Sequence, residues 1–286
     1  MDDHRPSASP PRQSEERLQA PPCRIGVPRR EQLQAQAIPL AGADPDITED
    51  DLAPLLERLA GAWLIGLGEA THGDHESFAF KQRLIQSLVR RGQCDVVIFE
   101  RGVAEMDAYD RYVTGQTDTL TIGGQLYPWV TEEVRDLLRW LRAWNADGGW
   151  VWFAGMDMQS PQGLSLALRL LDELGIVAPI AWPMLEQEVS EPGLTTDWYA
   201  GALERWRETA PPSLDLREEH CRWITLLADT FRQWLEVRLL AGQPDSRPWM
   251  LRDQFMAGNA LAQLARFGPD TKGVIWAHNG HVGMFG

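Results

Sequence analysis

Two titratable residues follow a short apolar stretch near the start of the chain. Glu69 and His72 come directly after residues 63–67 and are flanked by Gly68 and Gly73. Neutral histidine can take a proton from water near pH 7, and a neighbouring carboxylate can orient either the ring or the water. A lone histidine is more often structural, but one beside a carboxylate in a glycine-flanked turn favours a catalytic role.

The same arrangement recurs after three further apolar runs, at residues 94–99, 150–155 and 273–277. Apolar runs of this length are typical of strands in a parallel sheet that is buried on both faces. The carboxyl ends of such strands lie at one edge of the sheet, where α/β proteins bind ligands. We therefore expect the polar residues after these runs to converge with the first pair. They are Glu100, Asp157, His278 and His281.

Helical patterns separate the predicted strands, so the fold class is α/β, with a mainly parallel sheet flanked by helices. Apolar residues recur at helical spacing in 52–59 and 76–91, and Thr131 and Ser160 are expected N-caps of later helices. From about 176 to 248 we find no buried strand and predict a helical insertion over the carboxyl edge of the strands. Its five tryptophans either pack between helices or form an aromatic wall for a large apolar ligand.

Composition narrows the classes of partner. The chain has 286 residues and a formal net charge of −14, which disfavours nucleic acid and anionic membranes. Its 3 cysteines are widely spaced and odd in number, which fits a reducing cytoplasm better than a disulfide framework. No run is long enough to span a bilayer, and no apolar signal segment opens the chain. We expect a cytoplasmic protein.

The ends of the chain differ from the middle. Residues 1–44 are rich in Pro, Arg, Ser and Gln, which indicates a disordered tail before a domain at 45–286. The last predicted strand ends close to Gly286, leaving no residues for a helix that would cover the sheet after it. We expect the domain to be incomplete at its C-terminus.

Short motifs along the chain resemble the erythromycin esterase family in their order and spacing, from about Ile47 to the end. They are Gly68-Glu69-Ala70-Thr71-His72-Gly73, Phe99-Glu100, Pro128-Trp129 with Thr131-Glu132-Glu133, Gly155-Met156-Asp157-Met158-Gln159, Arg252-Asp253-Gln254-Phe255-Met256-Ala257 and Trp276-Ala277-His278-Asn279-Gly280-His281. Members of that family include esterases that open macrolide lactone rings, which gives antibiotic resistance, and proteins of succinoglycan biosynthesis.

The resemblance implies a hydrolase of a small-molecule ester or lactone that uses no cofactor. In the esterases the matching histidine is the general base, a role that falls here on His72. Glu69 would orient it, Glu100 would tune the charge or hold the water, and His281 would assist. The expected substrate-binding residues are His278, Arg252 and Asp157. No Gly-x-Ser-x-Gly nucleophile elbow is present in the sequence.

Other interpretations of these residues remain open at this stage. Glu100 and Asp157 could cap the helices after their strands, the two C-terminal histidines could bond to a neighbouring loop, and Arg252 could pair with Asp253 on the surface. Histidines with carboxylates could also hold zinc or manganese. A chain without its final segment could be an inactive or binding homologue. Oligomeric state and substrate are not predicted.

Overall fold

The structure is a computed structural model that describes residues 30–120, 128–209, 219–241 and 247–283. The chain divides into two compact units, Met1–Pro39 and Leu40–Gly286. Most of the predicted tail, residues 1–29, lies outside the described residues. Within the remainder of the tail, Arg30–Gln36 forms a helix, α1. All other elements belong to the second unit.

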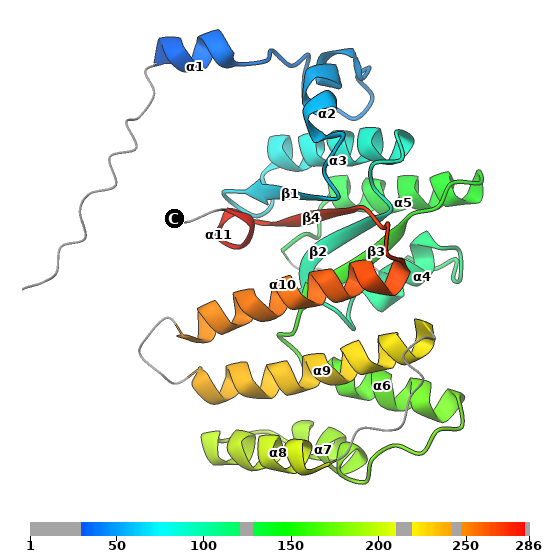
Figure 1. The fold of residues 1–286 in the computed structure, drawn as a ribbon, viewed down its shortest axis with the longest axis vertical. Helices are drawn as coiled ribbons and strands as arrows, with labels where there is room; N and C mark the ends of the chain where they lie inside the picture. Colours follow the sequence, from blue (N-terminus) through cyan, green and yellow to red (C-terminus); the bar gives the residue numbers. More distant parts are fainter. Residues whose placement is uncertain (1–29, 121–127, 210–218, 242–246, 284–286) are drawn as a thin grey trace, which may run out of the picture. The chain divides into compact units, whose positions relative to one another are not determined.

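The second unit is built on a four-stranded parallel sheet with the strand order β1-β4-β2-β3 (Figure 1). The strands are β1 (Leu64–Glu69), β2 (Val96–Gly102), β3 (Trp152–Asp157) and β4 (Gly273–His278). Glu69 at the end of β1 is level with His278 at the end of β4. The predicted α/β class, and the prediction of four parallel strands whose carboxyl ends share one edge, are therefore confirmed.

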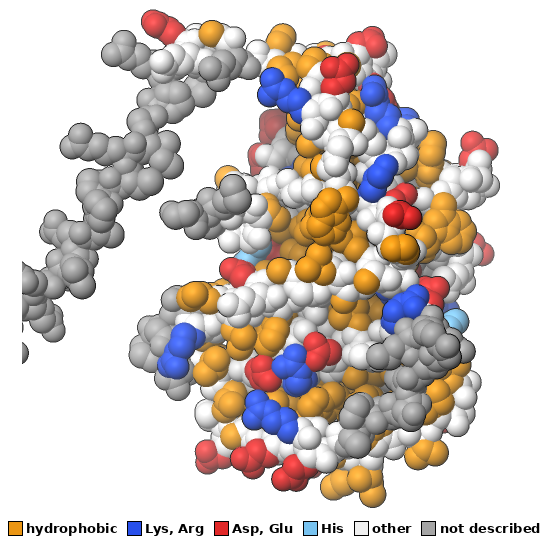
Figure 2. All heavy atoms as spheres, in the orientation of Figure 1, with side chains coloured by type: hydrophobic (Ala, Val, Ile, Leu, Met, Phe, Trp, Pro, Cys, Tyr) orange, Lys and Arg blue, Asp and Glu red, His pale blue; other side chains and the backbone are white. Residues whose placement is uncertain are grey.

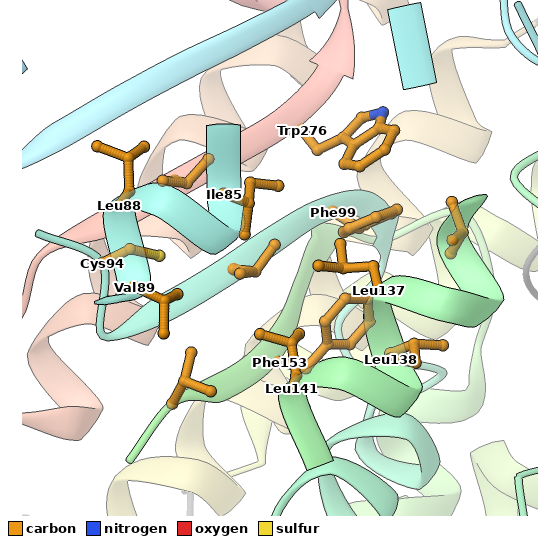
Figure 3. Close-up of a cluster of buried hydrophobic side chains, with 14 of the residues drawn as sticks. Ile85, Leu88, Val89, Cys94, Phe99, Leu137, Leu138, Leu141, Phe153 and Trp276 are labelled. Carbon is orange, nitrogen blue, oxygen red and sulfur yellow. The ribbon is translucent and has the colours of Figure 1, made fainter. Parts of the chain in front are cut away.

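One face of the sheet packs against η1 (Asp50–Leu52) and four helices. These helices are α2 (Ala53–Leu59), α3 (His75–Arg90), α4 (Asp107–Val113) and α5 (Glu132–Ala146). Their apolar side chains join those of the strands in a continuous core, in which Phe99, Phe153 and Trp276 lie near Ile85 and Leu137 (Figure 3).

Helix boundaries agree with the sequence in some places and differ in others. Thr131 caps α5 as predicted, because its side chain accepts a hydrogen bond from the backbone N–H of Val134. The prediction for Ser160 is wrong, since α6 (Gln162–Glu173) begins after Pro161 without a side-chain cap. On the apolar side of α3, Phe78 is fully buried while Phe80 is only partly buried.

The opposite face of the sheet carries α10 (Arg247–Phe267), which packs on β2 and β3. Beyond α10 lie α9 (Glu219–Leu240) and α6, and then α7 (Ala181–Val189) and α8 (Thr196–Glu208) (Figure 1). The helical nature of the insertion is thus correct for its described residues. Its position differs from the prediction, because most of it extends this helical layer away from the sheet and has a separate core.

Within the described part of the insertion, the end of α9 comes near the carboxyl end of β3. There Trp234 and Val237 line a cavity of about 320 Å³ together with Met158 and Gln159, which follow β3. Other tryptophans of the insertion pack between helices, as in the stack of Trp182 on Trp206 with ring centroids 4.8 Å apart.

The surface shows a group of hydrophobic side chains where β4 and α10 lie in this view (Figure 2). Leu64 of β1 and Ile275 of β4 are only partly buried on the face of the sheet that α10 covers elsewhere. Among the helices of the described ranges, none combines the length and apolar character that a membrane span requires.

Candidate active site

Glycines shape the carboxyl edge of β1. A β-carbon on Gly68 would lie 2.0 Å from Oδ1 of Asn279, so the short helix α11 (Asn279–Val282) packs directly against the backbone of β1. Gly73 has a φ of 81°, a conformation that glycine adopts without strain. This turn leads into α3, whose N-cap Asp74 accepts a hydrogen bond from Ser77. The close approach at Gly68 thus holds the motif at residues 68–73 beside the motif at residues 276–281.

Glu69 and His72 form the pair that the sequence predicts. Nδ1 of His72 lies 2.9 Å from Oε1 of Glu69, which is 2 % exposed. Donation of the Nδ1–H to the carboxylate fixes the tautomer and leaves the lone pair on Nε2. The His72 side chain is 31 % exposed, so a small molecule can reach the ring.

Two further side chains hold Glu69. Trp129 donates its indole N–H to Oε1 at 3.1 Å, and its ring packs edge-on against His72 with centroids 4.8 Å apart. Lys81 of α3 forms a buried ion pair with Oε2. Burial lowers the pKa of the Lys81 ammonium to about 7, and the negative charge of Glu100 opposes that shift. The carboxylate is therefore bound on both oxygens.

Glu100 is the centre of a second group of charges. Its Oε1 accepts from Nη2 of Arg252 at 2.9 Å and lies 3.1 Å from Nε2 of His281, while its Oε2 accepts from the backbone N–H of His278 at 2.9 Å. Burial acts to raise the pKa of Glu100, but the hydrogen bonds from His281, His278 and Arg252 outweigh it and lower the pKa to about 2. Glu100 is thus a permanent anion that organises its neighbours and does not cap a helix.

Arg252 and Asp157 form a buried pair. The guanidinium is 5 % exposed and donates from Nη2 to Oδ2 of Asp157 at 2.7 Å and from Nε to Oδ1 at 3.1 Å. The alternative of a surface pair between Arg252 and Asp253 is therefore wrong. Because these two of the three predicted substrate-binding residues are inside the protein and bonded to each other, they can act on a substrate mainly through charge.

His281 lies between two carboxylates. Its Nδ1 is 2.7 Å from Oδ1 of Asp253 and its Nε2 is 3.1 Å from Glu100. Nε2 also lies 3.1 Å from Nη1 of Arg252, and it can either donate to the carboxylate or accept from the guanidinium. The hydrogen bond to Glu100 raises the pKa of His281. This shift favours the imidazolium, which donates from both nitrogens.

His278 joins the two groups. Its Nδ1 accepts from the backbone N–H of Gly280 at 3.1 Å, which leaves Nε2–H to donate to the carbonyl of Ala70 at 3.2 Å. The ring lies 5.3 Å from that of His72 and 6.4 Å from that of His281, measured between centroids. Both nitrogens are bonded to backbone groups, one in α11 and one in the turn after β1, so these contacts are those of a structural histidine.

The electrostatics of the site favour the neutral form of His72. Burial lowers the pKa of His72, the negative charge of Glu100 acts against this and the positive charge of His281 adds to it. The ring is therefore neutral at pH 7, whereas His281 is biased toward the cation. A base with adjacent positive charge suits addition of water to a carbonyl.

Three residues of the site were not singled out by sequence reasoning. Lys81 lies on the same side of α3 as Phe78 and Ile85. A charged residue among apolar ones at helical spacing was therefore the feature of the sequence that could have indicated it. Trp129 stood in a motif without an assigned role, and the interaction of Asp253 with His281 could not be read from one sequence. Within the described ranges no group of three or more His, Cys, Asp or Glu residues could hold a metal ion.

The fold and the site define an α/β protein with a histidine–carboxylate pair and a buried ion network at the carboxyl edge of a parallel sheet. The chain belongs to the erythromycin esterase family, whose model, described as erythromycin esterase, matches residues 89–286. The Gly68–Gly73 motif precedes the matched residues, and the pairing of β1 with β4 places it beside the last motif.

Individual relatives agree with this assignment. Erythromycin esterase type II of Escherichia coli is 29% identical over 133 residues, which cover 45% of this chain and 31% of the relative. The crystal structure of a Bacillus cereus protein is 27% identical with a TM-score of 0.71, covering 88% of this chain and 65% of that one. A mutant of erythromycin esterase EreC in its open conformation is 16% identical with a TM-score of 0.61, covering 83% and 66%, and shows the fold alone. The chain thus spans less than two thirds of these relatives.

Proposed function

We propose that this chain hydrolyses a carboxylic ester or lactone with a water molecule that His72 deprotonates. The observation that carries the proposal is the contact of His72 Nδ1 with the buried carboxylate of Glu69. It orients a neutral, accessible imidazole with Nε2 as the basic atom. Membership of the erythromycin esterase family supports the choice of an ester bond.

In this mechanism Nε2 of His72 accepts a proton as the water oxygen attacks the carbonyl carbon. The tetrahedral oxyanion is stabilised by the positive charge of Arg252 and His281, which the carboxylates of Glu100 and Asp157 hold in place. Collapse of the intermediate breaks the ester C–O bond, and the imidazolium returns its proton to the leaving oxygen. The products are a carboxylic acid and an alcohol, joined in one molecule when the substrate is a lactone.

The test is a panel of esters and lactones, analysed by mass spectrometry for the addition of water. His72→Asn should lower the rate about 100- to 10,000-fold, as is usual for loss of a general base. His75→Asn is the matched control, because this histidine lies three residues away and its side chain is 73% exposed. Near-normal hydrolysis by folded His72→Asn would contradict the role of His72.

Metal dependence is tested in the same assay. We expect hydrolysis to continue after treatment with a chelator, since the proposed mechanism assigns both the base and the positive charge to side chains. Stoichiometric zinc or manganese in the purified protein, with activity lost on removal and recovered on return, would instead assign the activation of water to a metal.

A further inference from the structure

Lys81 is a charged residue in an apolar environment. It lies on the sheet-facing side of α3 in line with Phe78 and Ile85, and it is 4% exposed. Its ammonium lies 4.9 Å from the ring centroid of Trp276 and is paired with Oε2 of Glu69. A buried ammonium is costly unless it is paired, so this contact defines the position of Lys81.

The pairing matters because of what Glu69 does to His72. A carboxylate in hydrogen-bond contact with an imidazole favours the protonated ring, typically by more than one pKa unit. A protonated His72 could not accept a proton from water. Trp129 supplies Glu69 with a hydrogen bond but no net charge, so Lys81 is the cation in direct contact with Glu69 that offsets its charge.

We propose that Lys81 is a positioning residue that neutralises Glu69, so that Glu69 orients His72 without converting it to the imidazolium. This inference rests on the proposed function of His72 as the general base. Each buried glutamate of the site then has its own buried cation, Lys81 for Glu69 and Arg252 for Glu100.

Other groups that face His72 are balanced without Lys81. On β2, Glu100 is paired with Arg252 of α10 and with His281 of α11. His278, at the end of β4, has both ring nitrogens bonded to backbone groups. Burial is the main cause of the lowered pKa of His72, while the negative charge of Glu100 opposes the shift and the positive charge of His281 adds to it. The main electrostatic effect of losing Lys81 on His72 would therefore be that the negative charge of Glu69 is no longer offset.

The experiment is Lys81→Met, read by NMR titration of the histidine rings and by the pH profile of kcat/KM. The chain has 6 histidines, and the resonance missing from His72→Asn identifies His72. We expect the pKa of His72 to rise by about one unit or more. The acid limb of the pH profile of kcat/KM should shift to higher pH by the same amount, so activity should recover at higher pH.

Lys272→Met is the matched control, because Lys272 precedes β4 at the opposite edge of the sheet and donates to the carbonyl of Gly92. It should leave both readouts unchanged. Lys81→Met/Glu69→Gln removes both charges and should return the pKa of His72 toward the wild-type value. Lys81→Gln, which keeps a hydrogen-bond donor for Glu69, replaces Lys81→Met if that variant does not fold.

The outcomes separate this inference from the function on which it rests. A pKa of His72 that stays within a few tenths of wild type in the folded variant overturns the role of Lys81, even if activity falls at every pH. If the pKa rises and the limb of kcat/KM does not follow, Lys81 acts as proposed and His72 is not the base.

Discussion

Buried carboxylates decide what each histidine of the site can do. Glu69 carries a compensating cation and holds His72 as a neutral ring, whereas Glu100 draws His281 toward the cation. Two histidines that follow neighbouring strands therefore have opposite charge preferences at the same pH. Environments that separate pKa values in this way are typical of acid–base sites.

The pKa of Glu100 leads to a prediction about acid stability. It is about 2 in the folded protein against an ordinary value of 4.5, so the ionised form is stabilised by folding. The stabilisation is present above pH 4.5 and is lost as the pH falls through 2. The gap corresponds to on the order of 3 kcal/mol.

Glu100→Gln should therefore unfold more easily than the wild type at pH 7, by about 3–5 kcal/mol because Arg252 loses a buried partner. The difference in free energy of unfolding between variant and wild type should decrease below pH 4.5 and nearly vanish at pH 2. Urea unfolding at several pH values measures it. Glu132→Gln, an exposed carboxylate paired with Arg135, should behave like the wild type. A constant difference across the pH range would show that Glu100 does not titrate as inferred.

At the level of elements, the site depends on the close packing of α11 against β1. Gly68 allows this approach because Asn279 and Val282 occupy the space that a side chain would need. The register of β1 with β4 then brings the loop carrying His72 beside α11, which carries His281.

Gly68→Ala should destabilise the protein by about 1–3 kcal/mol, the usual cost of overpacking. It should also reduce hydrolysis, because α11 must move away together with His281. Gly61→Ala is the control, since a β-carbon there would meet no atom within 4 Å. Differential scanning calorimetry and the ester assay measure the two effects. Unchanged melting and activity in Gly68→Ala would show that α11 can shift at little cost.

At the scale of the whole molecule, part of the sheet is uncovered. On the side where α10 packs on β2 and β3, Leu64 and Ile275 remain partly exposed. Exposed apolar surface of this kind promotes association. This chain aligns with only part of the length of each relative.

We predict that the chain self-associates through this face. Ile275→Thr keeps a β-branched side chain suited to a strand but removes apolar surface, and it should weaken association in sedimentation equilibrium. Val177→Thr, at a side chain that is 89% exposed between α6 and α7, should have no effect. A monomer at all concentrations, or equal effects of both variants, would exclude this face as the contact.

The strands and the edge at which the candidate site forms follow from local features of the chain. Four apolar runs specify buried strands whatever their neighbours are, since burial on both faces leaves no room for polar residues. Their polar ends had to meet once the strands were parallel. The same reasoning placed Thr131 at the start of α5, because capping is a local interaction.

The pairing of the polar groups depends instead on how the elements pack against one another. The last strand, β4, enters between β1 and β2, and this order sets His278 beside Glu69 and His281 beside Glu100. Periodicity specifies which side of an element is buried, but not which element lies opposite. Two features depend on which elements face each other, and they could be found only in the folded chain. They are the contact of Lys81 with Glu69 and the position of the insertion beyond α10.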